Sequence, residues 1–128
     1  MGGRVAAYIA SNRTDSMSHL IGVFCISYPL HKAKEEHQVS MLRTSHLEGV
    51  KQIPLLIING TEDEMCNFEV MERVFGTLEN ARKELCWIKD ADHSLKIRGR
   101  LDRGGQTKTL TSVCESLIDW CHYCSLNE

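Results

Sequence analysis

The most informative stretch of this sequence runs from Ile53 to Cys66 and reads I-P-L-L-I-I-N-G-T-E-D-E-M-C. Its segment Leu55–Ile58 is continuously apolar, which is too short for a helix and too uniform for a strand with one face in water. Pro54 and Gly60 bound this apolar segment. A segment of this kind is typical of a strand that is buried on both faces of a parallel sheet.

Two further apolar segments predict strands, Leu20–Ser27 before the central run and Glu84–Lys89 after it. Apolar residues recur at helical spacing between and around these strands. They predict one helical turn and three helices: His46–Val50, Gly2–Ala10, Asn67–Leu78 and Thr107–Tyr123. This alternation of helices and strands predicts an α/β fold with about three parallel strands, right-handed crossovers and helices on both faces.

Three polar segments are expected to be loops: Asn12–Ser18, His31–Ser45 and Ser94–Gly105. The histidines at 31, 37 and 46 raise the possibility of a metal site, but their spacing matches no common ligand pattern, so a solvated loop is favoured. The third loop carries Lys96, Arg98, Arg100 and Arg103. These four cations could bind a phosphate, but the neighbouring glycines and Asp residues favour a solvated loop here too.

Composition excludes several classes of function for these 128 residues. A formal net charge of −2 provides no reason to expect binding to nucleic acid. No apolar run approaches the roughly 20 residues that a membrane helix needs, so no membrane association is expected. Six cysteines without a secretory signal indicate reduced thiols and a cytoplasmic or nuclear protein.

The C-x-x-C pattern at Cys121 and Cys124 has several possible interpretations. A zinc site would require a second pair of ligands, and a redox motif would open a helix that follows a strand. Two thiols in the core of a helix are therefore the favoured interpretation, and no metal or other cofactor is expected.

Chemically useful side chains follow two of the predicted strands. Asp63 lies just after the central strand, and His93 lies just after the third. In open α/β sheets, functional groups gather at the carboxyl ends of the strands. A histidine acts as a general base when a carboxylate fixes its tautomer, so Asp63 and His93 are the candidate acid and base of a hydrolytic triad. The alternatives are that Asp63 caps a turn and that His93 is an ordinary loop histidine.

The nucleophile of such a triad is expected on a G-x-S-x-G turn between a strand and a helix, earlier in the chain. No such turn precedes the first strand of this sequence, which begins Met1-Gly2-Gly3-Arg4. Because Met-Gly-Gly commonly follows that serine, Met1 is expected to correspond to the position directly after the nucleophile.

Several blocks carry a family resemblance that spans nearly the whole chain. They are Gly3–Ala7, Cys25–His31, Gly60–Cys66 and Asp92–Ser94 followed by Gly99-Arg100. With these blocks the chain resembles the α/β-hydrolase-like family of testis-expressed protein thirty and NSL-complex subunit three. The resemblance implies a dienelactone-hydrolase-like fold with Asp63 as triad acid and His93 as triad base. It also implies that residues 1–128 form the C-terminal half of that fold, without the N-terminal strands and the nucleophile turn.

Three interpretations follow from this resemblance. The first is a serine-hydrolase-like (esterase-like) domain that retains acid and histidine and is inactive alone, with an unknown small-molecule substrate. The second is a non-catalytic interaction module of the NSL-complex type. In either case, the strand Leu20–Ser27 would have an open edge able to recruit a protein partner. The third is that the serine-bearing strand is encoded upstream of this sequence.

Overall fold

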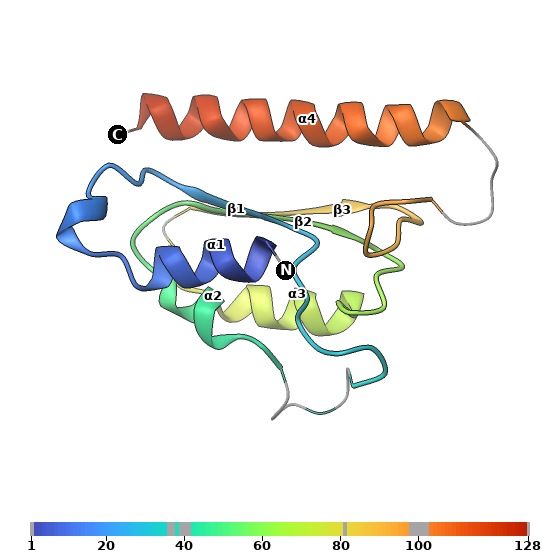
Figure 1. Ribbon diagram of the computed structural model, residues 1–128, viewed down its shortest axis with the longest axis horizontal. Coiled ribbons are helices and arrows are strands. Elements are labelled where there is room, and N and C mark those ends of the chain that lie inside the picture. The colour runs from blue at the N-terminus through green and yellow to red at the C-terminus, as the bar shows by residue number, and fades with distance from the viewer. Residues whose placement is uncertain (1, 36–37, 39–41, 81, 98–102, 128) are drawn as a thin grey trace.

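The computed structural model describes residues 2–35, 38, 42–80, 82–97 and 103–127, and in them a parallel sheet lies between two layers of helices (Figure 1). The sheet has three strands in the order β1-β2-β3. In chain order the elements are α1 (Gly2–Ser11), the 3₁₀ turn η1 (Asp15–Met17), β1 (Val23–Ile26), α2 (Ser45–Gly49), β2 (Leu55–Gly60), α3 (Phe68–Thr77), β3 (Lys83–Ile88) and α4 (Arg103–Leu126). The predicted α/β class and three parallel strands are confirmed.

β2 is the central strand because its residues can be buried on both faces of the sheet. All six of its residues are buried, and it pairs with β1 on one side and with β3 on the other. Successive side chains of a strand point to opposite faces. Leu55 and Ile57 accordingly join one hydrophobic core, whereas Leu56 and Ile58 join the other.

The helices divide between these two faces, with α1, α2 and α3 below the sheet in Figure 1 and α4 above it. α1 buries Gly3, Ala7 and Ala10, so its small-residue face packs closely on β1, as the sequence predicts. On the opposite face, α4 contributes Val113, Trp120 and Cys124 to the second core.

The two ends of α3 are closed by side chains. The Asn67 side chain accepts a hydrogen bond from the Val70 N–H at 3.1 Å, which confirms Asn67 as the N-cap. At the other end, the Lys83 ammonium donates to the carbonyls of Phe75 and Leu78, the last of which follows the helix. A cation at this position also interacts favourably with the helix dipole.

Two elements differ in length from their predicted ranges. β1 begins at Val23 rather than at Leu20, because its partner strand begins only after Pro54, which has no N–H to extend the ladder. α4 begins at Arg103 rather than at Thr107, so the predicted loop ends earlier than expected. Gly104 and Gly105 lie in its first turn, and each glycine costs only about 1 kcal/mol in a helix.

β1 forms one edge of the sheet that the described residues make. The N–H of Val23 donates to the carbonyl of Pro54, just before β2, and the N–H of Ser27 donates to that of Ile58 in β2. Alternation therefore directs the backbone groups of Phe24 and Ile26 away from the sheet. An apolar groove of about 400 Å³ lies between this edge and α1, lined in part by Gly3 and Ala6. The Phe24 side chain beside it is 43% exposed.

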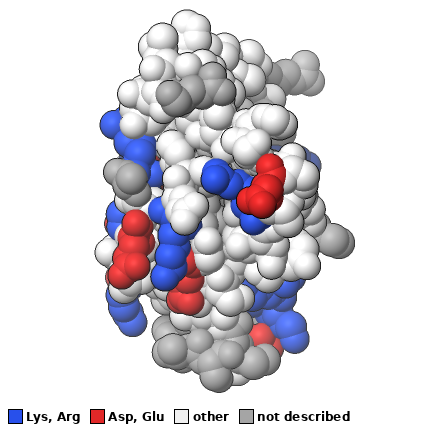
Figure 2. Space-filling model, turned by 90° about the vertical axis from the view of Figure 1, so that its left-hand side faces the viewer, with Lys and Arg blue, Asp and Glu red and all other residues white. Residues whose placement is uncertain are grey.

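Charges of both signs are interspersed at the end of the molecule formed by the amino ends of the strands (Figure 2). Lys51 pairs there with Glu79 at 3.7 Å, and Arg82 pairs with Glu84. This face therefore carries no field of one sign. Among the described helices, none combines the length with the apolar composition that crossing a bilayer requires.

Candidate active site

A close approach at Gly60 brings the ends of β2 and β3 together. The N–H of Glu62 donates to the carbonyl of Ala91 at 2.9 Å, and the N–H of Thr61 donates to the carbonyl of Ile88 at 3.0 Å. A Cβ atom at Gly60 would lie 2.0 Å from the Ala91 carbonyl oxygen, so only glycine fits. This contact holds the residues after β2 against the loop that carries His93.

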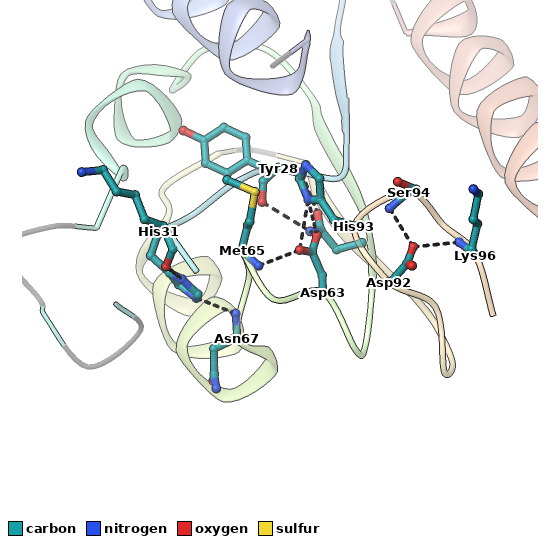
Figure 3. A network of polar contacts seen from close by, with 11 residues as sticks. Tyr28, His31, Asp63, Met65, Asn67, Asp92, His93, Ser94 and Lys96 are labelled. Carbon is teal, nitrogen blue, oxygen red and sulfur yellow. Dashed lines mark hydrogen bonds and ion pairs between the residues drawn. The ribbon is translucent and has the colours of Figure 1, made fainter. Parts of the chain in front are cut away.

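Asp63 and His93 meet at this edge of the sheet, and their side chains point toward one another (Figure 3). The Nδ1 atom of His93 lies 3.0 Å from Oδ1 and 2.9 Å from Oδ2 of Asp63. The Asp63 side chain is fully buried, whereas that of His93 is 30% exposed. The structure therefore brings the two predicted site residues into direct contact.

Two further donors hold the Asp63 carboxylate in place. The Asn59 amide donates to Oδ2 at 3.2 Å, and the Met65 N–H donates to Oδ1 at 2.8 Å. The side-chain oxygen Oδ1 of Asn59 accepts the N–H of Tyr28 at 3.0 Å, so this cluster is bonded to the residues that follow β1. Donors of this kind stabilise negative charge on a carboxylate, so a buried Asp63 can serve as an acceptor for His93.

The contact with Asp63 decides the tautomer of His93. A carboxylate can only accept, so Nδ1 carries a proton and donates it, and in the neutral ring the lone pair is then on Nε2. In the described part of the chain, no group makes a hydrogen bond to Nε2. An imidazole with a bare Nε2 can take a proton from a nucleophile.

The loop around His93 is ordered by the Asp92 carboxylate, which accepts the N–H groups of Ser94 at 2.8 Å and Lys96 at 3.0 Å.

The buried thiols near the sheet are poor candidates for that nucleophile. Burial raises the pKa of Cys25 to about 12, and its thiol donates to the Gly3 carbonyl at 3.2 Å. Burial, with a smaller contribution from the charge of Asp63, raises the pKa of Cys66 as well. Thiols that stay protonated at neutral pH are weak nucleophiles.

Other predictions about polar residues need correction. His31 was expected in a solvated loop, but it is only 1% exposed, because both of its ring nitrogens have backbone partners. Cys124 is buried, as expected of a core thiol, but Cys121 is exposed. Cys121 lies at the flank of α4, where it lines an open apolar pocket with Ile21 and Phe24 and does not enter the core.

The two predicted ligand clusters are only partly covered by the structure. His37, Arg98 and Arg100 lie outside the described residues. His46 is in contact with the ring of Tyr8, with 5.2 Å between the ring centroids. Within the ranges that the structure describes, no cluster of His, Cys, Asp and Glu is suited to hold a metal ion.

Sequence reasoning missed Asn59 and Gly60 as parts of the site and treated them only as the end of a strand. A polar residue inside an otherwise apolar run is the signal that could have identified Asn59, because a buried amide requires partners. The close approach at Gly60 becomes visible only when the next strand is in place.

A parallel α/β sandwich whose strands end in a contacting carboxylate and imidazole has the architecture of α/β hydrolases, in which acid and histidine follow successive strands. A family model described as an alpha/beta hydrolase domain matches residues 1–122, which include every strand and most of α4. The chain therefore belongs to the α/β-hydrolase domain family.

Proposed function

We propose that Asp63 and His93 are the acid and base of a serine-hydrolase-type triad, and that this chain lacks the nucleophile and is inactive alone. The observation that carries the proposal is the contact of Nδ1 with the buried carboxylate, together with an Nε2 atom that has no hydrogen-bond partner among the described residues. Without a nucleophile, covalent catalysis of ester hydrolysis is lost.

A further strand that carries the nucleophile would complete the site. The free edge of β1 is the place for it, because β1 ends at the same edge of the sheet as Asp63 and His93. Phe24 and Ile26 offer backbone groups to such a strand. On this proposal, the described residues form the acid-and-base part of a serine-hydrolase-like domain.

Fluorophosphonate labelling tests the lack of a nucleophile. The purified chain should take up no label, and a label mapped to any residue would contradict the proposal. The lone pair on Nε2 of His93 can be tested separately from enzyme activity. An imidazole with a bare nitrogen attacks the activated ester p-nitrophenyl acetate as a nucleophile, which is a background reaction that needs no serine and no triad. This background rate should be higher for the wild type than for His93→Gln and Asp63→Asn, and equal rates would refute the oriented, bare Nε2 on which the base assignment rests.

A non-catalytic interaction module is the second candidate, and the apolar groove beside the β1 edge favours it. Strand addition to an exposed edge is a common mode of peptide recognition. A protein that co-purifies at one-to-one stoichiometry with the wild-type chain and with His93→Gln, but not with Phe24→Lys, would support this function. Loss of the partner in His93→Gln would favour a role that depends on the catalytic pair.

Within the family, we propose kinship with testis-expressed protein thirty and NSL-complex subunit three. The blocks Cys25–His31 and Gly60–Cys66 support this proposal, since both border the site described above. We further propose a cytoplasmic or nuclear location, which fits the six free cysteines.

A further inference from the structure

We propose that His31 is a positioning residue that holds the segment carrying the acid of the site, acting on Asp63 through Met65 and Asn67. The inference rests on the proposed role of Asp63 as triad acid. His31 follows β1 in the chain and is almost wholly buried, at 1% exposure, below the end of the sheet where Asp63 lies.

His31 contacts the segment after Asp63 at two points (Figure 3). Its backbone N–H donates to the Met65 carbonyl at 3.1 Å, and its ring atom Nε2 accepts the N–H of Asn67 at 2.8 Å. Met65 in turn donates its own N–H to Oδ1 of Asp63 at 2.8 Å. Met65 is thus bonded to His31 through its carbonyl and to the carboxylate through its N–H, so displacement of one contact disturbs the other.

The partners of the ring define its chemical state. Because the Asn67 N–H is a donor, Nε2 must present a lone pair. The ring proton is then on Nδ1, which donates to the Lys32 carbonyl at 2.8 Å. Both nitrogens are therefore occupied by backbone groups, which leaves His31 neither a metal ligand nor a base.

Asn67 extends the effect of His31 to α3. Its side chain accepts the N–H of Val70, so the residue whose backbone binds His31 also begins that helix. The segment Asp63–Asn67 is thereby fixed at one end by the carboxylate cluster and at the other by His31 and the helix cap. Loss of the Nε2 acceptor should free the second end and loosen the hydrogen bond between Asp63 and His93.

Two substitutions separate the acceptor from the volume of the ring. His31→Gln keeps an acceptor near the Nε2 position, whereas His31→Met fills similar space without one. The readout is the low-field NMR resonance of the His93 Nδ1 proton in its bond to Asp63. We expect this proton to exchange with solvent at least about fivefold faster in His31→Met and at nearly the wild-type rate in His31→Gln. If His31→Met does not fold, His31→Asn replaces it, because its shorter amide does not reach Asn67.

Leu47→Ala is the matched control for general destabilisation, because Leu47 is as fully buried as His31 but lies in α2, away from the Asp63–Asn67 segment in the chain. It should lower the melting temperature and leave the resonance unchanged. The proposal is overturned if the His93 Nδ1 proton exchanges at the wild-type rate in His31→Met, or if it exchanges as fast in His31→Gln as in His31→Met. A wild-type resonance that survives Asp63→Asn refutes the pair itself, and with it the proposed function. That outcome is distinct from a failure of His31 alone.

Discussion

Asp63 is the residue on which the candidate site depends most. It lies fully buried as a side chain and accepts hydrogen bonds from His93, Asn59 and Met65. Each of the three donors offsets part of the cost of burying this carboxylate. Its two roles, as turn cap through Met65 and as partner of His93, were alternatives in the sequence and coexist in the structure.

Replacing Asp63 by Ala should destabilise the fold as well as the site. The buried donors of Asn59 and Met65 lose their acceptor, and each such loss typically costs about 1–3 kcal/mol. Urea denaturation should show a loss of about 2–4 kcal/mol in the free energy of unfolding. The partly exposed His93 provides the comparison, because His93→Gln should cost about 1 kcal/mol or less. Equal losses of free energy in Asp63→Ala and His93→Gln would contradict the claim that the buried Asp63 contributes more to stability than the partly exposed His93.

Alkaline pH should unfold the protein through its buried thiols. Below pH 9 the Cys25 thiol keeps its proton in both states. Between pH 9 and about pH 12 only the unfolded chain ionises, because burial raises the pKa of the folded state to about 12. The free energy of unfolding should therefore fall across this range. Thermal melts from pH 7 to 11 check it.

Cys25→Ala is the control for the alkaline loss. The fall should become shallower in this variant without vanishing, since Cys66 and Tyr28 also have pKa values raised by burial. A pH profile of Cys25→Ala that is parallel to that of the wild type would show that Cys25 does not contribute.

The sequence reveals Asp63 and His93 because both follow apolar runs, and parallel strands align their carboxyl ends. It does not reveal Asn59 or His31. Periodicity identifies which face of an element is apolar, but it cannot show that a single polar side chain turns inward to a backbone partner. Asn59 bonds to Tyr28, 31 positions away in the chain, and His31 bonds to Asn67, 36 positions away, so local periodicity cannot reveal these contacts.

At the scale of elements, the approach of β2 to the loop after β3 sets the geometry of the site. Gly60→Ala should disrupt it, because the added methyl group meets the backbone of Ala91 and not a flexible side chain. We expect a loss of about 3 kcal/mol or more in the free energy of unfolding. Chemical denaturation, with the His93 Nδ1 resonance followed in parallel, measures both effects.

Gly76→Ala is the matched control. Gly76 lies near the end of α3 with no atom within 4 Å of the added carbon. Alanine there should stabilise the helix by about 0.5–1 kcal/mol. A loss from Gly76→Ala as large as that from Gly60→Ala would show that glycine replacement is harmful irrespective of close contacts.

The exposed edge of β1 should make the isolated chain prone to association. Unpaired strand edges with apolar side chains recruit further strands, and a lysine on the edge opposes this. Phe24→Lys should reduce concentration-dependent aggregation several-fold, as measured by light scattering and thioflavin fluorescence. Ile118→Lys, at an even more exposed apolar position on α4, should have a smaller effect. Equal effects of the two would contradict an edge-specific process.

The elements themselves were predictable where their patterns are strong. α3 lies within one residue of its predicted range at each end, and β2 begins at Leu55 as predicted but ends two residues later than the apolar segment, at Gly60. The start of β1 was not predictable, because a strand begins where its partner can pair. Likewise, α4 extends through two glycines that read as a loop when considered alone.

At the scale of the whole molecule, the candidate site lies at the carboxyl ends of the strands (Figure 3), and mixed charges lie at their amino ends (Figure 2). The two helix layers bury both faces of β2 but leave the β1 edge accessible. Membership of the α/β-hydrolase family and the contact of Asp63 with His93 together support a proton-relay role for this end of the molecule.

The state of the His93 ring tests this account most directly. Long-range ¹H–¹⁵N NMR at neutral pH distinguishes a protonated Nδ1 from a protonated Nε2. We predict that the neutral form of the ring carries its proton on Nδ1 and leaves Nε2 bare, and that this proton is redistributed in Asp63→Asn. A wild-type ring protonated on Nε2, or a tautomer unchanged by Asp63→Asn, would contradict the central claim that Asp63 holds His93 ready to act as a base.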